Sequence, residues 1–343
     1  MIIVMRQGAT QAEIDHVCRH ITDLGYTPHP IYGKERVVIG AIGDERGRRE
    51  AQAALSMQSG VESVALILKP YKRVSLELKR ERTLVQVGEG AAAAVFGGQQ
   101  FVVIAGPCSV ESEEQVLAAA RAVKDAGAHL FRGGAFKPRT SPYSFQGLAA
   151  EGLRLLSLAR QETGLPFVTE VVTVRDVETI AGCADMLQIG ARNMMNYQLL
   201  REAGQTGKPI LLKRGLAATL EELLMAAEYV ANEGNERIVL CERGIRTFEP
   251  HTRNTLDLSA IPAIHSLSHL PIIADPSHAT GRPELIGPMV HATIACGADG
   301  AMVEVHPDPE SAYSDGAQSI TPEAFARIMD EARGFVAAAG RRL

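Results

Sequence analysis

The stretch PILLKRGLAATLEELLMAAEYVANEGNERIVLCER (209–243) contains the repeating unit that decides the fold. Its two ends, PILLKR (209–214) and RIVLCER (237–243), are short and nearly continuous apolar runs. Such runs are typical of strands that are buried on both faces of a parallel sheet. Residues 219–232 between them have an amphipathic helical pattern. The stretch therefore predicts a β-α-β unit with two parallel strands.

The same alternation begins at residue 101 and continues through the rest of the chain. Six further strands are predicted at FVVIAG (101–106), HLFR (129–132), PFVTEV (166–171), MLQIG (186–190), PIIADPS (271–277) and GAMVEV (300–305). Helical patterns separate these runs, for example at 113–126, 284–296 and 321–337. Eight units in about 240 residues predict an α/β fold, a (β/α)8 TIM barrel, over residues 101–343. An open doubly wound sheet is the alternative, but it would normally use fewer strands.

Residues 1–69 have a different pattern. Strands are predicted at 2–5, 26–33, 35–43 and 61–68, and helices at 11–24 and 46–58. The order β-α-β-β-α-β is that of a small α+β, ferredoxin-like domain. Such a domain could serve packing and dimerisation, or it could sense a ligand. Residues 70–100 are expected to form a linker, with a hairpin from TLVQVGEG and AAAAVFGGQQ that caps one end of the barrel.

Composition excludes several classes of protein. The 343 residues include 35 Lys and Arg against 40 Asp and Glu, a net charge of −5, which argues against a nucleic-acid partner. No apolar run reaches the roughly 18–20 residues that a membrane span needs. The start, MIIVMRQGAT, lacks the features of a secretory signal. Five scattered cysteines do not form a disulfide framework, so a cytoplasmic location is expected.

Charged residues gather where the predicted barrel strands end, which is where TIM barrels carry their active sites. A basic set consists of Arg132, Lys137, Arg139, Arg192, Lys213 and Arg243. Two phosphates and one carboxylate would bring roughly four to five negative charges to balance these cations. The set therefore indicates two small phosphorylated substrates. For any single cation, pairing with the strand-end carboxylates Glu170 or Glu242 is the alternative.

A second set of polar residues has the chemistry of metal ligands. Cys108, His278, Glu304 and Asp315 follow different strands and offer a thiolate, an imidazole and two carboxylates. This mixture of borderline and hard donors suits Mn, Fe, Co or Zn. His306 is a rival ligand, because it shares a face with Glu304 if the strand continues that far. Taken alone, Cys108 would also fit a buried apolar position.

Seven motifs carry a resemblance to a known family. They are IAGPCSVES (104–112), FRGGAFKPRTSPYSFQGL (131–148), QIGARNMMN (188–196), LLKRG (211–215), CERGIRTFE (241–249), ADPSHATG (274–281) and MVEVHPDPESAYSDGAQS (302–319). Together they resemble 3-deoxy-D-arabino-heptulosonate 7-phosphate (DAHP) synthases of type I-beta over residues 101–335. KPRTSP discriminates most, because octulosonate 8-phosphate synthases typically carry a KANRSS-like segment there. Residues 1–69 resemble the ferredoxin-like (ACT-like) extension of feedback-regulated members.

The resemblance implies a transferase that condenses phosphoenolpyruvate with erythrose 4-phosphate and water, the first step of the shikimate pathway. It implies Cys108, His278, Glu304 and Asp315 as ligands of a divalent metal. Phosphoenolpyruvate would be surrounded by Arg132, Lys137, Glu170, Arg192, Lys213 and Arg243. The aldose phosphate would be held by Arg139 and Thr140. Lys137, a metal-bound water and His278 are candidate acids for the aldehyde oxygen, and Cys108 contributes to catalysis through the metal.

The resemblance also implies regulation and assembly. The N-terminal domain would bind tyrosine or phenylalanine as an effector, and the chain would form a homo-oligomer, a tetramer. Three alternatives differ in chemistry. They are an octulosonate 8-phosphate synthase, a Schiff-base aldolase that uses Lys213, and an amino-acid-sensing protein built on an inactive barrel.

Overall fold

A computed structural model describes residues 1–33, 35–44, 46–66, 70–137, 141 and 143–343. The chain divides into two compact units, Met1–Glu81 and Arg82–Leu343. No helix in these described ranges is both long enough and apolar enough to cross a membrane.

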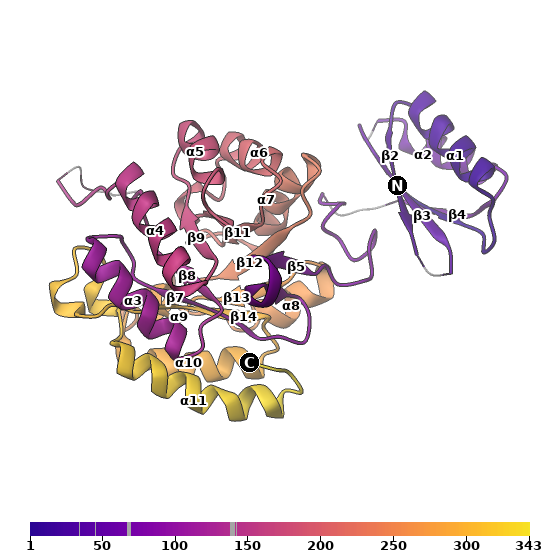
Figure 1. The fold of residues 1–343 in the computed structure, drawn as a ribbon. Helices are drawn as coiled ribbons and strands as arrows, with labels where there is room; N and C mark the ends of the chain where they lie inside the picture. Colours follow the sequence, from indigo (N-terminus) through magenta and orange to yellow (C-terminus); the bar gives the residue numbers. More distant parts are fainter. Residues whose placement is uncertain (34, 45, 67–69, 138–140, 142) are drawn as a thin grey trace. The chain divides into compact units, whose positions relative to one another are not determined.

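The first unit is a four-stranded antiparallel sheet covered on one face by two helices (Figure 1). Its strands run in the order β2-β3-β1-β4 and its elements are β1 (Ile2–Met5), α1 (Gln11–Asp23), β2 (Thr27–Tyr32), β3 (Val37–Ile42), α2 (Arg48–Ser56) and β4 (Val61–Ala65). Thr10 and Glu13 form a capping box that begins α1. The predicted ferredoxin-like order is therefore present.

The other face of this sheet is covered in part by the chain that follows it. Leu78 packs with Ile2 and leaves no room for a side chain at Gly40, where a Cβ atom would lie 2.7 Å from Leu78 Cδ1. Tyr71 and Val74 are also buried. The compact unit therefore extends beyond residue 69 to Glu81, because apolar side chains of residues 70–81 are buried in it.

The second unit is a closed barrel of eight parallel strands. They are β7 (Val102–Gly106), β8 (Leu130–Arg132), β9 (Phe167–Glu170), β10 (Met186–Ile189), β11 (Ile210–Lys213), β12 (Ile238–Glu242), β13 (Ile272–Ala274) and β14 (Gly300–Glu304). β14 pairs with β7 and closes the barrel, with Glu304 beside Gly106. The structure confirms the predicted TIM barrel, and each strand lies within its predicted run.

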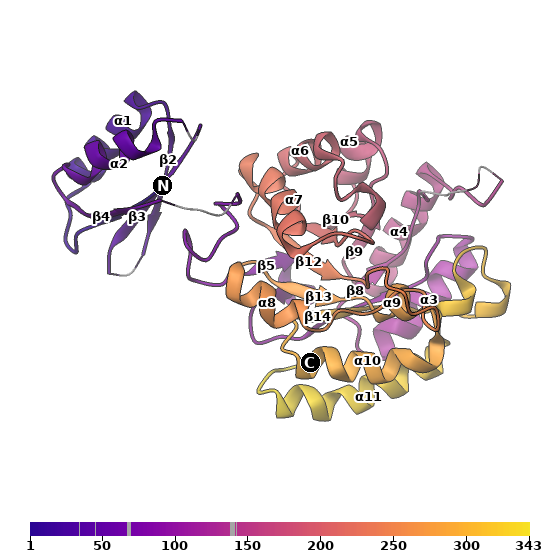
Figure 2. The ribbon, with the colours of Figure 1, turned by 180° about the vertical axis from the view of Figure 1, so that it is seen from behind.

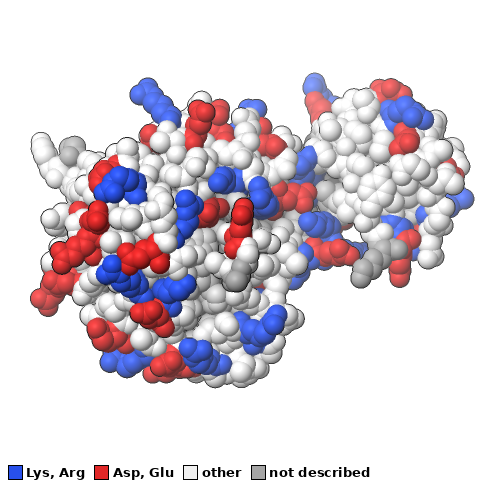
Figure 3. Space-filling model, viewed as in Figure 1, with Lys and Arg blue, Asp and Glu red and all other residues white. Residues whose placement is uncertain are grey.

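Helices surround the barrel (Figures 1 and 2). They are α3 (Glu113–Asp125), α4 (Ala150–Thr163), α5 (Val177–Ala181), α6 (Tyr197–Gln205), α7 (Leu220–Asn232), α8 (Ala260–Leu267), α9 (Pro276–Thr280), α10 (Pro283–Ala295) and α11 (Pro322–Ala338). On the face shown in Figure 3, acidic and basic side chains are interspersed over this unit, with no extended patch of one sign.

A two-stranded hairpin, β5 (Val85–Val87) with β6 (Ala94–Phe96), precedes the barrel. Phe96 is fully buried in one cluster with the inward-facing side chains of the barrel, among them Val102 at the start of β7. The hairpin thus covers the end of the barrel where the strands begin. The opposite end, where the strands finish, is free to hold polar groups.

Candidate active site

A cavity of about 390 Å³ lies at the carboxyl ends of the barrel strands. We call it the anion cavity, because positively charged groups dominate its wall. Five of the six predicted cations line it, namely Arg132, Lys137, Arg192, Lys213 and Arg243, together with Glu170. The predicted Arg139 and Thr140 lie outside the described residues. Three lining residues that the sequence did not single out, Arg246, Arg253 and Asn254, come from the loop after β12.

The cations of the cavity differ in their partners. Arg132 donates to Glu304 at 2.8 Å, and the ammonium of Lys213 pairs with Asp275. Buried Arg243 donates only to the backbone oxygens of Gly244 and His278, and no carboxylate of the described residues lies within ion-pair distance of it. Arg243 therefore has a positive charge that remains available for a bound anion.

The alternative pairing with strand-end carboxylates applies to a different arginine. Arg214, next to Lys213, donates to Glu242 at 2.8 Å and to Asp257 at 2.9 Å. Burial raises the pKa of Glu242, although Arg214 opposes this effect. This network connects β11, β12 and the loop after β12, which carries the additional arginines of the cavity wall.

Glu170 lines the cavity and contacts residues on β10 and directly after it. Gln188 donates to its Oε2 at 3.3 Å. A Cβ atom at residue 190 would overlap Glu170 Oε1, so only glycine at that position leaves room for the carboxylate. The carboxylate therefore lies among the cations, where it can orient a water molecule.

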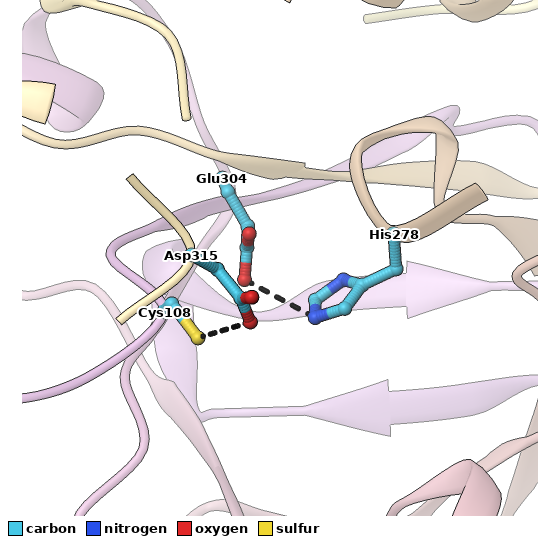
Figure 4. A group of neighbouring side chains, drawn as sticks. All are labelled: Cys108, His278, Glu304 and Asp315. Atoms are coloured by element: carbon cyan, nitrogen blue, oxygen red, sulfur yellow. Dashed lines mark hydrogen bonds and ion pairs between the residues drawn. The ribbon is translucent and has the colours of Figure 1, made fainter. Parts of the chain in front are cut away.

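The four predicted metal ligands come together beside the anion cavity (Figure 4). One donor atom from each of Cys108, His278, Glu304 and Asp315 lies within 4.8 Å of the others, and we call these residues the ligand group. Cys108 Sγ is 3.2 Å from Asp315 Oδ2, and His278 Nε2 is 3.2 Å from Glu304 Oε1. His278 and Asp315 also line the cavity, so the two sites share a wall.

The backbone places these ligands from four separate segments. Cys108 follows β7, where Gly106 has φ +145° and a side chain would overlap the carbonyl oxygen of Arg132. His278 lies in α9 directly after β13, and Glu304 is the last residue of β14. Asp315 has φ +53°, a left-handed conformation that Asp tolerates better than most residues. Strain of this kind is common where a site must hold a side chain in place.

The ionisation of the group fits a divalent cation. Burial raises the pKa of the Cys108 thiol to about 12, and the charge of Glu304 adds to the effect. Burial lowers the pKa of His278 despite its two carboxylate neighbours, Asp275 and Glu304. Burial raises the pKa of Asp315, but the charges of His278 and Arg253 outweigh it and hold the value at about 2. A thiol, an imidazole and two carboxylates are side chains that divalent metals bind, and binding of the metal releases the proton of the thiol.

The rival ligand His306 turns away from this group. Its Nδ1 accepts from the backbone N–H of Asp308 at 3.0 Å, and its Nε2 lies 3.4 Å from Glu111. β14 ends at Glu304, so the alternation along the strand does not bring residue 306 to the same face. His306 is therefore not part of the ligand group.

Two residues that surround the ligand group were not singled out from the sequence. Gln318 donates to Glu304 Oε2 at 2.5 Å and accepts from Arg253 at 2.5 Å. Asp275 is fully buried between Lys213 and His278. The sequence offered one signal for Asp275, namely its position three residues before His278, at the point where a helix begins.

Comparisons with known proteins decide the family. The DAHP synthetase I family matches residues 84–337, and the DAHP synthase ferredoxin-like domain matches residues 1–69. The chain belongs to the DAHP synthetase I family. A phospho-2-dehydro-3-deoxyheptonate aldolase of Thermotoga maritima is 47% identical over 340 residues, which cover 99% of each chain.

Solved structures of DAHP synthases have the same fold. The crystal structure of the aldolase (DAHP synthase) from T. maritima has a TM-score of 0.78 at 47% identity and covers 99% of this chain and 98% of its own. A truncated form of the T. maritima DAHP synthase has a TM-score of 0.72 at 46% identity, covering 78% of this chain and 97% of its own.

A more distant relative bears on one alternative. A 2-dehydro-3-deoxyphosphooctonate aldolase of Syntrophotalea carbinolica is 34% identical over 259 residues, 70% of this chain and 92% of its own. Membership of the DAHP synthetase I family thus makes this chain a DAHP synthase of the shikimate pathway, and the octulosonate alternative is only a distant likeness. Family membership also argues against the alternative of an amino-acid-sensing protein built on an inactive barrel. The Lys213 nitrogen is paired with Asp275, whereas the Schiff-base alternative needs a lysine nitrogen that is free to attack a carbonyl carbon.

Proposed function

We propose that the anion cavity and the ligand group together condense phosphoenolpyruvate with erythrose 4-phosphate and water to give DAHP and phosphate. The observation that carries this proposal is the wall that the two sites share, formed by His278 and Asp315. A carbonyl oxygen beside the ligand group would lie next to an anion in the cavity. This is the juxtaposition that a carbon–carbon coupling between two phosphorylated substrates needs.

The cations hold the substrates in place. We assign phosphoenolpyruvate to Arg132, Lys137, Glu170, Arg192, Lys213 and Arg243, which line one cavity. Arginine forks match phosphate and carboxylate groups with two parallel hydrogen bonds. Arg139 and Thr140 are assigned to the aldose phosphate from the resemblance alone. Cations on several sides of the cavity offset the repulsion between two anionic substrates.

The reaction is balanced by one water molecule, whose two protons end on the aldehyde oxygen and on the released phosphate. C3 of phosphoenolpyruvate attacks the aldehyde carbon, and a carbon–carbon bond forms while positive charge develops at C2. Water, oriented by Glu170, adds to C2 and loses a proton. The bond between C2 and the ester oxygen of the phosphate then breaks, the proton of the C2 hydroxyl passes to the departing phosphate, and C2 becomes a ketone. The aldehyde oxygen gains a proton and becomes a hydroxyl group.

Lys137 is the acid that the geometry favours for the aldehyde oxygen. Its ammonium lies 2.9 Å from Cys108 Sγ, next to the ligand group. Both ring nitrogens of His278, in contrast, face carboxylates, at 2.7 Å and 3.2 Å. A divalent cation (Mn, Fe, Co or Zn) held by Cys108, His278, Glu304 and Asp315 would supply Lewis acidity at the aldehyde oxygen.

A direct assay tests the proposed function. Phosphoenolpyruvate consumption and phosphate release are followed with erythrose 4-phosphate, or with a five-carbon aldose phosphate, as the acceptor. Each assay is repeated after treatment with a chelator and after addition of Mn²⁺ or Zn²⁺. We expect turnover with the four-carbon acceptor, loss with chelator and recovery with metal. Preference for the five-carbon acceptor, or turnover by metal-free enzyme, would contradict the assignment.

We further propose that residues 1–69 form a regulatory domain for tyrosine or phenylalanine, with 101–343 as the catalytic barrel and 70–100 as connector and hairpin. The domain's own core and its family match support this. A chain that begins at residue 80 retains Arg82 and its ion pair with Asp299. It should remain active and lose inhibition by either amino acid. Inhibition that persists without the domain would place the effector elsewhere.

Assembly and location complete the proposal. We propose a homotetramer in the cytoplasm, the setting that its biosynthetic role and its five free cysteines support. Light scattering of the full chain measures the mass of the assembly. A monomeric mass at working concentration would contradict the tetramer.

A further inference from the structure

Asp275 is a fully buried carboxylate that touches both sites and has no role in the reaction described above. We propose that Asp275 is a positioning residue that orients His278 toward the metal and Lys213 toward the substrate anion. This inference rests on the proposed function, since it concerns the same ligand group and cavity.

The contacts with His278 determine how its ring is turned. Asp275 Oδ2 lies 2.7 Å from His278 Nδ1, and Asp275 Oδ1 accepts from the backbone N–H of His278 at 2.9 Å. The contact of Nδ1 with Asp275 Oδ2 is a close ion pair rather than an aligned hydrogen bond, and no described group accepts a hydrogen bond from Nδ1. Nε2 is thereby left facing Glu304 and the remaining ligands. A carboxylate on the second ring nitrogen is the usual way in which proteins orient a metal-binding histidine.

The same carboxylate oxygen also holds Lys213. The Lys213 ammonium is buried, pairs with Asp275 Oδ2 and otherwise contacts the sulfur of Met302 at 3.8 Å. Lysine has a long, flexible stem, so a fixed partner determines where its charge lies. An ammonium has three donor hydrogens, and with one on Asp275 and one toward the Met302 sulfur, one remains for a bound anion in the cavity that Lys213 lines. One oxygen atom thus orients a group in each site.

Asp275 also caps the start of α9, and this local role offers a competing explanation for the residue. Asn caps helices about as well as Asp. Asp275→Asn therefore retains the cap and removes only the negative charge and one acceptor atom.

The test measures metal binding without substrate. Metal-free protein is titrated with Co²⁺, followed by absorption and by competition with a chelator, and helix content and thermal unfolding are recorded alongside. We expect Asp275→Asn to bind Co²⁺ about 10- to 100-fold more weakly than wild type. Asp185→Asn is the matched control. Asp185 pairs with Arg160 at 3.0 Å at the opposite end of the barrel, so the affinity should not change. Wild-type affinity in folded Asp275→Asn overturns the proposal.

Two more variants separate orientation from a general loss of structure. Lys213→Gln removes the cation but leaves Asp275 with His278, so we expect wild-type Co²⁺ affinity and weaker phosphoenolpyruvate binding. If Lys213→Gln weakens Co²⁺ as much as Asp275→Asn does, the proposal is wrong. If Asp275→Asn does not fold, it is replaced by the double variant Asp275→Asn with Lys213→Gln, in which both members of the buried ion pair are neutral. We expect this double variant to bind Co²⁺ about 10- to 100-fold more weakly than wild type. Failure of wild type to form DAHP would refute the proposed function and leave this metal titration unaffected.

Discussion

Arg243 gives the sharpest test of the anion cavity, because its buried charge has no carboxylate partner among the described residues. Burial lowers the pKa of Arg243, and the neighbouring charge of Asp275 only partly offsets this. A guanidinium in this state is unfavourable in the free protein and favourable once an anion binds. Arg243→Met keeps the length and apolar character of the stem and removes the charge.

The size of the effect follows from the hydrogen bonds at stake. Each hydrogen bond to a charged group contributes about 1.5–3 kcal/mol. Loss of two such bonds in a bidentate contact costs about 3–6 kcal/mol, which corresponds to about a 10²- to 10⁴-fold weaker affinity. The free energy of unfolding should stay the same or rise, because an uncompensated buried charge has been replaced by an apolar group.

Calorimetric titration with phosphoenolpyruvate and thermal unfolding without substrate measure the two quantities. Arg121→Met is the control. Arg121 is exposed and pairs with Glu162 on the outer helices, so its replacement should change neither phosphoenolpyruvate affinity nor the melting temperature appreciably. The reasoning is refuted if Arg243→Met binds phosphoenolpyruvate as wild type does. It is also refuted if the variant's melting temperature falls sharply, since Arg243 would then have a structural partner.

Two further predictions concern metal binding and stability. Cys108→Ala should lose metal and nearly all activity while remaining folded, whereas Cys183→Ala should retain both; metal content and turnover check this, and full activity of metal-free Cys108→Ala would contradict it. Asp299→Asn should lower the free energy of unfolding by about 3–5 kcal/mol at neutral pH, measured by denaturant titration. Burial raises the pKa of Asp299, but the hydrogen bond from His265 and the charge of Arg82 hold it below its ordinary value. The stabilisation by Asp299 is therefore fully present above the pKa that its carboxyl has in the unfolded chain. It is lost as the pH falls through the lower pKa of the folded protein. The difference in the free energy of unfolding between wild type and Asp299→Asn should therefore disappear at acidic pH. A difference that does not change with pH would refute the charge of Asp299 as its origin.

Some features of the site could be predicted because the barrel imposes them. Parallel strands joined by helices must all finish at one end, so residues that follow different strands meet there. This is why Cys108 and His278, 170 positions apart in the chain, could be placed in one group before their distances were known. The strand assignments required only the apolar runs and their spacing.

Other features depended on local geometry that no pattern records. Asp275 and His306 both stand near predicted ligands, yet one supports His278 and the other turns to Glu111. The orientation of His306 depends on where β14 ends, and that of Asp275 depends on the turn into α9. The arginines at 246 and 253 come from a loop whose path carries no periodic signal.

The sequence by itself determined the barrel, the two-part organisation and the chemical types at each strand end. These follow from the periodic burial of apolar side chains, which is a property of consecutive residues. Only the tertiary structure decided which charges are paired and which remain available to bind an anion. That division separates Arg243 from Arg132 and Lys213, and it depends on distances between groups on different strands. Ion pairing acts over a few ångströms in space, regardless of separation along the chain.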